Sequence, residues 1–292
     1  MFRYIHLPLK AIKRWAALCI SVTLLFCAGY TLRRVTAVDT TRTGTPLLVL
    51  MYHSILPNPG RIGRYVCSPE TLQNDMEYLA ANGYTAVSVA QVLDYQAGRG
   101  TLPPKAVMLT FDDGFYNNYV YVYPLLQKYN MKAIFCVVGK YCFEPPDDTM
   151  NAAYSSLTGE QMREMEASGR VEIANHSYDM HSHNNRNGVS KRAAESQEEY
   201  HQTLSQDLQK LQQRLTQEIG HAPVSFAYPF GAFTKTTDDV LRDNGFLVTF
   251  SCVEGINDLH PGDDLYRLKR YNRPGGRSTE SFLGPIISRV GE

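Results

Sequence analysis

Short apolar runs alternate with helix-like segments along most of this 292-residue chain, and this alternation limits the folds that it can adopt. The apolar runs have the length of buried strands, whereas the segments between them place hydrophobic residues at helical spacing. The strand-like runs lie at residues 46–53, 84–89, 106–109, 132–138, 171–175, 224–228, 246–250 and 265–271. Strands that alternate with helices pair in parallel. Seven or eight such units are expected to close into a barrel rather than to form an open sheet.

Capping residues place several of the helices. Ser68, Pro69 and Glu70 form a typical helix start, and Gly83 is a typical helix end. The segment 193–220 is long and polar with a single leucine stripe, which predicts a solvent-facing helix that packs along this stripe. Further helices are expected at residues 89–98, 117–129, 158–169, 236–244 and 279–290, and irregular loops at residues 54–64 and 142–154.

An uncharged apolar stretch, residues 15–32, follows four basic residues near the start of the chain. A stretch of about 18 residues is near the lower limit for a helix that spans a bilayer, and upstream cations favour a cytoplasmic N-terminus. We therefore expect a cytoplasmic basic segment at 1–14, a single-pass transmembrane signal anchor at 15–32, a linker at 33–45 and an extracytoplasmic catalytic domain at 46–292.

A cleaved signal peptide is the alternative for this stretch, and it would leave a secreted domain. A weak small-residue cleavage site lies at residues 35–37, but Arg33 and Arg34 separate it from the apolar stretch, which disfavours cleavage. In either case the domain is expected outside the cytoplasm, with the cell membrane as its location if the anchor stays.

Composition excludes some classes of partner and of site. The formal net charge is +0, so the charge balance gives no support for binding to nucleic acid. Two of the six cysteines lie in the apolar stretch, and the other four, Cys67, Cys136, Cys142 and Cys252, lack the paired spacing of a zinc ribbon. Buried free thiols are expected, and disulfides that involve Cys136 or Cys142 are the alternative. A monomer is expected.

The sequence Thr110-Phe111-Asp112-Asp113-Gly114 ends one of the apolar runs with two adjacent carboxylates. Neighbouring residues of a strand point to opposite faces, so the two side chains must have different roles. Two carboxylates in one place repel each other unless a cation intervenes. A bound metal is the natural cation, with one Asp as its ligand and the other Asp held close as a base. An ordinary strand followed by an Asp-Gly turn is the alternative.

Three histidines, His176, His181 and His183, follow the apolar run 171–175 within eight residues. Imidazole nitrogens and a carboxylate suit a divalent metal of the zinc type. Two His and one Asp leave coordination positions open for water and substrate, as a catalytic site requires. Both polar clusters lie at the C-terminal ends of strands, where barrel enzymes carry their active sites. A histidine-rich surface loop is the alternative.

With these two motifs the chain resembles the polysaccharide deacetylase family (the NodB-like domain of carbohydrate esterase family 4) from about residue 46 to residue 290. The resemblance implies a distorted (β/α) barrel in which Asp112 is the general base and Asp113 and His176 are metal ligands. The next histidine, His181, follows His176 by five residues, a spacing similar to that of the poly-N-acetylglucosamine deacetylase-like branch. His181 is therefore assigned as the third ligand, with His183 as the fallback and Asp179 as a weaker candidate. The expected ion is zinc, with nickel, cobalt or manganese as alternatives.

The segment 226–231, Phe-Ala-Tyr-Pro-Phe-Gly, resembles the family motif that lines the substrate groove. The resemblance implies that Tyr228 and Phe230 bind substrate, and that the backbone N–H of Phe230 holds the oxyanion. Many family members have an arginine in the place of Ala227 that holds the base carboxylate. This chain lacks it, and Lys269 or Arg270 are the candidate replacements. An ordinary strand-to-loop turn is the alternative interpretation.

The general acid has no match in the usual place, because the family's C-terminal Leu-x-His motif and its Asp and Trp motif are both absent. The candidate is His53, a polar residue that ends the first apolar run. Similar Tyr-His pairs occur in the same branch of the family. A structural histidine with satisfied hydrogen bonds is the alternative for His53.

These residues predict a metal-dependent hydrolase that removes N-acetyl groups from a cell-envelope polysaccharide containing N-acetylglucosamine and releases acetate. The polymer would be peptidoglycan or an exopolysaccharide. The alternatives are a catalytically inactive sugar-binding module, an amidase that acts on another N-acyl group, and a glycoside hydrolase, which would need two carboxylates but no histidine cluster.

Overall fold

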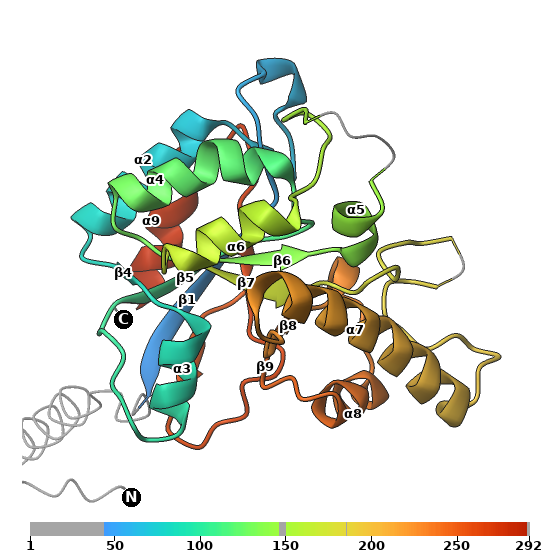
Figure 1. Ribbon diagram of the computed structural model, residues 1–292. Helices are drawn as coiled ribbons and strands as arrows, with labels where there is room; N and C mark the ends of the chain where they lie inside the picture. Colours follow the sequence, from blue (N-terminus) through green and yellow to red (C-terminus); the bar gives the residue numbers. More distant parts are fainter. Residues whose placement is uncertain (1–43, 146–149, 185, 291–292) are drawn as a thin grey trace, which may run out of the picture. The chain divides into compact units, whose positions relative to one another are not determined.

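The computed structural model describes residues 44–145, 150–184 and 186–290, and nine strands of this part form one sheet (Figure 1). The strand order is β10-β1-β5-β6-β7-β8-β9, β11 also pairs with β1, and β4 also pairs with β5. The strands are β1 (Thr45–Tyr52), β4 (Thr85–Ala86), β5 (Ala106–Phe111), β6 (Ala133–Val137), β7 (Val171–Asn175), β8 (Ser225–Ala227), β9 (Val248–Phe250), β10 (Asn257–Leu259) and β11 (Tyr271–Asn272). All pairs are parallel except that of β1 with β10.

Helices cover the outside of the sheet, with α2, α4 and α9 on one side and α7 and α8 on another (Figure 1). The α-helices are α2 (Pro69–Ala81), α3 (Val89–Gln96), α4 (Tyr123–Lys128), α5 (Gly139–Phe143), α6 (Gly159–Ala167), α7 (Gln197–Ile219), α8 (Lys235–Asp243) and α9 (Thr279–Val290). Short 3-10 turns are η1 (Pro59–Arg61) and η3 (Pro229–Gly231), a π-helical turn is η2 (Asn118–Val122), and β2 (Ser54–Ile55) pairs with β3 (Val66–Cys67) in a separate small sheet. Ser68 caps α2 by accepting from the Thr71 N–H, as the sequence predicts.

The sheet is a half-barrel, because β9 at one of its ends does not pair directly with β1 among the described strands. Residues between β9 and β11 cross this gap. The Leu268 N–H donates to the Thr249 carbonyl (2.8 Å), the Ser251 N–H donates to the Leu268 carbonyl (2.9 Å), and β11 then pairs with β1. The prediction of an α/β fold with parallel strands is therefore confirmed, whereas the expected closure of the sheet into a barrel is wrong, because the described strands form a half-barrel.

Four local features differ from the sequence predictions. The expected strand at 265–271 shares only Tyr271 with β11, because Arg267 has a φ of 61° and interrupts the extended backbone. The antiparallel strand β10 was not expected, since Asn-Asp-Leu carries no apolar alternation. The helix expected at 117–129 begins with the π-helical turn η2, and α5 occupies the start of the expected loop at 142–154.

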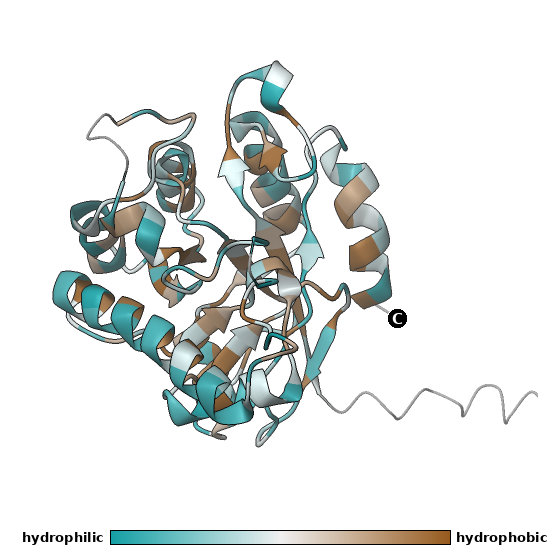
Figure 2. Cartoon of the chain, turned by 90° about the vertical axis from the view of Figure 1, so that its right-hand side faces the viewer, coloured by the Kyte–Doolittle hydropathy of each residue, from teal (hydrophilic) through white to brown (hydrophobic). Residues whose placement is uncertain are grey.

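Alternate residues of the strands pack into two different cores. In β1 and β5, Leu48, Leu50, Val107 and Leu109 face the surrounding helices. The residues between them, such as Leu47, Val49, Ala106 and Met108, face the interior of the half-barrel. Figure 2 shows hydrophobic residues along the central strands and hydrophilic residues over the long helix α7. The same alternation decides which residues at the strand ends point into the mouth of the half-barrel.

A buried ion pair joins α2 to the chain after β11. The Arg273 guanidinium donates to both oxygens of Asp75 at 2.7 and 3.0 Å, and both side chains are 0% exposed. The hydroxyls of Tyr52 and Thr279 also donate to Asp75, at 3.0 and 2.6 Å. This network therefore connects β1, α2 and the first residue of α9.

Replacing Arg273 with methionine is expected to lower the free energy of unfolding by about 3–5 kcal/mol, because it leaves the Asp75 carboxylate buried without its cation. Urea unfolding followed by circular dichroism measures this change. The matched control is Arg99→Met, which removes an exposed pair with Asp94 and is expected to cost less than about 1 kcal/mol. Equal losses in the two variants would contradict the structural role of Arg273.

Four cysteines of the described chain are free thiols. Cys67, Cys136 and Cys142 are buried, as expected, and the alternative of a disulfide at Cys136 or Cys142 is not formed. Cys252 differs from the expectation because it is exposed.

No helix within residues 44–145, 150–184 and 186–290 combines the length and the hydrophobicity needed to cross a bilayer. The predicted transmembrane anchor at 15–32 lies outside the described residues.

Candidate active site

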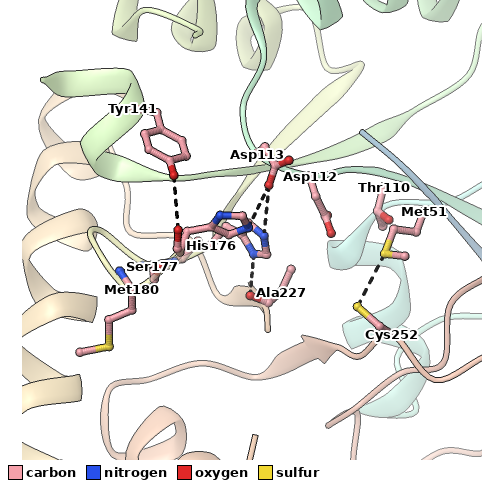
Figure 3. Close-up of polar contacts among 12 residues, drawn as sticks. Met51, Thr110, Asp112, Asp113, Tyr141, His176, Ser177, Met180, Ala227 and Cys252 are labelled. Carbon is pink, nitrogen blue, oxygen red and sulfur yellow. Dashed lines mark hydrogen bonds and ion pairs between the residues drawn. The ribbon is translucent and has the colours of Figure 1, made fainter. Parts of the chain in front are cut away.

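A cavity of about 580 Å³ opens at the mouth of the half-barrel, where the C-terminal ends of β1, β5, β7 and β8 meet. Eight residues that the sequence assigns to the site line it: His53, Asp112, Asp113, His176, His181, His183, Tyr228 and Phe230. Figure 3 shows Asp112 and Asp113 side by side, with Asp113 directed toward His176. The structure therefore brings both predicted polar clusters into one site.

Asp112 is held by Arg270 from the crossing segment. In β5, Met108 faces the barrel interior, and Thr110 and Asp112 continue this inward alternation. Two guanidinium nitrogens of Arg270 donate to the two oxygens of Asp112 at 2.8 and 2.9 Å. Arg270 is 0% exposed, and it also donates to the Ser251 carbonyl (2.8 Å) and to the Thr110 hydroxyl (3.1 Å).

The charge state of Asp112 follows from this pairing. Burial raises the pKa of the Asp112 carboxyl, but Arg270, with smaller contributions from His176 and His53, more than offsets burial and holds that pKa well below its usual range. Of the two cations that the sequence offers as replacements for the missing family arginine, Arg270 is the partner of Asp112. Lys269 is exposed, and only its backbone carbonyl and N–H are bound, by the side chain of Asn257.

Asp113 turns out of the strand direction and faces two imidazoles. Its φ of 75° is in the left-handed region, which costs a non-glycine residue of order 1–3 kcal/mol. The Oδ1 atom lies 3.2 Å from Nε2 of His181 and 3.6 Å from Nε2 of His176. This buried oxygen has no hydrogen-bond partner among the described residues. Burial raises the pKa of Asp113, but His181, His53 and His176 together more than offset burial, so the net direction of the pKa shift is downward.

The protonation of His176 is fixed by the strand next to it. Its Nδ1 lies 2.8 Å from the Ala227 carbonyl, which can only accept, so Nδ1 carries the proton (Figure 3). Burial lowers the pKa of His176 to about 4, so the ring is neutral at pH 7. Nε2 therefore presents a lone pair toward the orphaned Asp113 oxygen.

The three side chains Asp113, His176 and His181 fit a divalent metal ion. Their ligand atoms all lie within 4.8 Å of one another. A neutral ring nitrogen and a carboxylate oxygen that face each other without a proton between them are stabilised when a cation is shared. His176 also has the backbone carbonyl behind its second nitrogen that metal-bound histidines usually have. Nitrogen and carboxylate donors are those that zinc and related ions prefer.

A network of hydrogen bonds fixes the loop that carries His181. Ser177 has a φ of 71°, and its N–H donates to the Asn175 side chain at 2.8 Å. The carboxylate of Asp207, in α7, accepts from the N–H groups of Tyr178 (2.7 Å) and Asp179 (2.8 Å). This loop places His181, rather than the residue before it, against Asp113.

The two weaker ligand candidates, Asp179 and His183, do not belong to this group of three side chains. The Asp179 carboxylate accepts from Lys140 at 2.9 Å in an exposed pair. The His183 ring stacks on the Phe230 ring with centroids 3.8 Å apart.

His53 points into the same cavity from the end of β1. Its Nδ1 is buried and has no hydrogen-bond partner among the described residues, which does not fit a structural histidine with satisfied hydrogen bonds. Burial lowers the pKa of His53, whereas the carboxylates of Asp112 and Asp113 oppose this change. The exposed ring of Tyr65 covers one side of His53, with centroids 4.7 Å apart.

The two aromatic residues predicted to bind sugar have different surroundings. Phe230 is 40% exposed and sits on a left-handed turn, with a φ of 59°, so its ring lies at the cavity. Tyr228 is 0% exposed, its ring packs against Phe226 and Phe233, and its hydroxyl donates to Asp238 at 2.6 Å. The expectation that the Tyr228 ring stacks on a sugar is therefore corrected, because that ring belongs to the core beneath α7 and α8.

Sequence reasoning missed several residues that line the cavity, among them Arg64 and Tyr65. Both lie between β2 and β3, where Arg64 ends the loop expected at 54–64 and Tyr65 follows it. No periodic pattern in this segment indicated that its side chains return to the mouth of the half-barrel.

Comparison with known proteins gives a consistent result. A family model described as polysaccharide deacetylase matches residues 99–249. A poly-beta-1,6-N-acetyl-D-glucosamine N-deacetylase of Escherichia coli is 28% identical over 237 residues, or 74% of this chain. The match covers only 35% of that longer protein, so this chain spans about a third of the length of its E. coli relative.

Solved structures share the whole fold. A de-N-acetylase from Aggregatibacter actinomycetemcomitans superimposes with a TM-score of 0.71 at 30% identity, covering 83% of this chain and 99% of that one. IcaB from Ammonifex degensii gives a TM-score of 0.69 at 28% identity, covering 85% and 98%. Since the family model spans the strands that carry Asp112, Asp113 and His176, and a solved de-N-acetylase matches over nearly its full length, the chain belongs to the polysaccharide deacetylase family.

Proposed function

We propose that this protein hydrolyses the N-acetyl groups of a polysaccharide containing N-acetylglucosamine, releasing acetate and leaving free amines on the polymer. The observation that carries the proposal is the pairing of an ionised, buried carboxylate, Asp112, with an adjacent group of three metal-binding side chains. A poly-β-1,6-N-acetylglucosamine exopolysaccharide is the first candidate substrate, since relatives bear that name, and peptidoglycan is the second.

Asp113, His176 and His181 would hold the divalent ion, for which zinc is expected and nickel, cobalt or manganese are alternatives. Such an ion supplies Lewis acidity, which polarises an amide carbonyl and lowers the pKa of water. His176 contributes its lone pair at Nε2, and the Ala227 carbonyl keeps that ring in the required tautomer. The remaining steps belong to side chains of the protein.

Asp112 is proposed as the general base that removes a proton from the attacking water. Each carboxylate oxygen keeps a lone pair free after it accepts from Arg270, so the pairing still allows Asp112 to accept a proton. Arg270 also orients the carboxylate, because a bidentate contact fixes both oxygens in one plane. We assign the proton donor for the departing amine to His53, whose buried Nδ1 is unpartnered.

The oxyanion and the sugar are proposed to be held at the β8 loop. The backbone N–H of Phe230, on a left-handed turn at the cavity, is proposed as the oxyanion donor. The exposed Phe230 ring, supported by its stack on His183, is the surface for a sugar ring. Tyr65, 47% exposed beside His53, replaces Tyr228 in this role.

The cellular setting is proposed from the sequence. We propose a monomer anchored by residues 15–32 in the cell membrane, with the catalytic domain on the extracytoplasmic side, where the polymer is found. Cleavage of the anchor would instead give a secreted enzyme.

The proposed function is tested by acetate release from poly-β-1,6-N-acetylglucosamine and from peptidoglycan. Treatment with a chelator is expected to reduce release to the background rate, because Asp113, His176 and His181 alone provide no nucleophile, and stepwise addition of zinc, nickel, cobalt or manganese should restore it. Release that survives complete removal of metal would contradict the mechanism. Tight binding of either polymer without turnover in any metal would support an inactive binding module, and turnover of small N-acyl amides alone would support a different amidase.

A further inference from the structure

The active-site cavity continues into a second cavity beside α9. Three side chains, Arg64, Glu254 and Asn272, line both the active-site cavity and a neighbouring one of about 410 Å³. The second cavity is bounded by the segment after β11 and by α9, and its lining includes Arg277 and Arg289. The two cavities have volumes within the range of ligand-binding pockets, so together they form a groove longer than the catalytic centre alone.

Positive charge is concentrated along this groove. Arg61 and Arg64 lie on the side of the active site, and Arg277 and Arg289 lie on the side of α9. Outside the catalytic pair Asp112 and Asp113, the only acidic residue of the described lining is Glu254. The chain as a whole has a formal net charge of +0, so four arginines against one glutamate are a local excess and not a reflection of composition.

Arg61, Arg64 and Arg277 are exposed, and none of them forms an ion pair with an acidic side chain in the described part of the chain. The Arg277 guanidinium donates to the Ser281 carbonyl and lies over the Phe282 ring, with its carbon 5.6 Å from the centroid, so its charge is not neutralised by a carboxylate. Arg64 instead lies over the Tyr65 ring, with its guanidinium carbon 5.2 Å from the centroid.

Backbone contacts hold these arginines in fixed relative positions. The Asn272 side-chain amide donates to the Arg64 carbonyl at 3.1 Å, and the Gly275 N–H donates to the Gly63 carbonyl at 2.8 Å. These bonds tie the loop before β3 to the segment that leads into α9. The other polar atom of Asn272, Oδ1, is buried without a hydrogen-bond partner in the described residues. Two hydrogen bonds therefore connect the segment that carries Arg64 to the segment that precedes Arg277.

We propose that this groove binds an anionic substituent, a carboxylate or a phosphate, carried by the polysaccharide next to the sugar that is deacetylated. The inference rests on the proposed function and narrows its substrate class to an acidic polymer. Guanidinium groups form paired hydrogen bonds with carboxylate and phosphate oxygens, whereas a neutral N-acetylglucosamine chain offers no charge to match them. Because the groove begins at Arg64 beside Tyr65 and His53, an anion bound there also sets the register of the chain at the catalytic centre.

The test measures binding and turnover of one β-1,6-linked N-acetylglucosamine oligomer in three forms: unmodified, partly O-succinylated and partly O-phosphorylated. Metal-loaded full-length protein is expected to bind at least one acidic form about tenfold more tightly than the neutral form at low ionic strength, as several paired charges would give. Preference for the succinylated or for the phosphorylated form distinguishes a carboxylate from a phosphate as the natural group. The preference should shrink in about 0.5 M salt, because the arginines are exposed.

Two variants locate the effect. Arg64→Gln and Arg277→Gln should each raise Kd and KM for the preferred acidic oligomer about three- to tenfold, and Arg277→Gln, which lines only the second cavity, should leave kcat and the neutral oligomer unchanged. Arg64→Lys should restore part of the loss, since it restores the charge without the planar fork. The matched control, Arg99→Gln, removes an equally exposed arginine that lines neither cavity and should change nothing.

The outcomes separate this inference from the proposed function. Equal binding of neutral and acidic oligomers, or a preference that survives both substitutions, overturns the inference while acetate release from the neutral form still supports deacetylation. Preferential binding of an acidic oligomer without acetate release from any form supports the groove and contradicts the proposed catalysis. Failure to bind any of the three forms contradicts both.

Discussion

Replacing Asp112 with asparagine is expected to lower acetate release by about 10²- to 10⁴-fold, the usual contribution of a general base. The substitution keeps the size of the side chain and one carbonyl oxygen, so Arg270 retains a partner. It removes the lone pairs of an ionised carboxylate that could take a proton from water. Metal content, measured by elemental analysis, should stay at the level of the unmodified protein, because Asp112 is not among the three ligands.

Two other carboxylates, Asp113 and Asp179, provide the controls for the Asp112→Asn variant. Asp113→Asn should lose both metal and activity, since its Oδ1 faces both imidazoles. Asp179→Asn, on the same loop as His181 but paired with Lys140 at the surface, should leave both within about twofold. If Asp112→Asn lost its metal, or if Asp179→Asn did, the proposed assignment of Asp112 as base and of Asp113, His176 and His181 as ligands would be wrong.

Replacing Arg270 with methionine is expected to destabilise the fold by about 3–5 kcal/mol, because a carboxylate that is 2% exposed loses its bidentate cation. The double variant Arg270→Met with Asp112→Asn should recover much of this loss, since no charge is then left buried. Urea unfolding of both single variants and the double variant gives the coupling free energy directly. An additive result, with no recovery in the double variant, would contradict the pairing.

Lys269→Met is the matched control for this experiment. Lys269 is the adjacent cation, and it is exposed with no side-chain partner in the described residues. Its replacement should change the free energy of unfolding by less than about 0.5 kcal/mol. Should Arg270→Met fail to fold at all, recovery of a folded protein in the double variant still measures the same coupling.

The strand ends could be predicted from the sequence, because alternation of side chains in β5 and β7 is a local property. Asp112, Asp113 and His176 follow apolar runs directly, and His181 follows within the same loop. The sequence could identify the cation beside Asp112 only as Lys269 or Arg270. It lies 158 residues from Asp112, on a segment that is not a regular strand, and a buried arginine has no local pattern that separates it from an exposed one.

The error at Tyr228 has a different origin. Ala227 faces the barrel interior and Phe226 faces the helices, so strict alternation already places Tyr228 opposite to a substrate-facing position. The resemblance to the family motif predicted that the Tyr228 ring lies in the substrate groove. The alternation of side chains along the strand instead predicts that this ring lies in the core. The local physical rule was the better guide at this residue.

The crossing segment between β9 and β11 has a consequence for how the protein becomes active. The matched family region, residues 99–249, contains the three proposed metal ligands but neither His53 nor Arg270. His53 directly follows β1, and Arg270 directly precedes β11. The strands β1 and β11 pair with each other, although most of the domain lies between them in the sequence. During synthesis the metal ligands therefore exist long before Asp112 has its cation, and the centre is completed only when the last part of the chain closes onto the first.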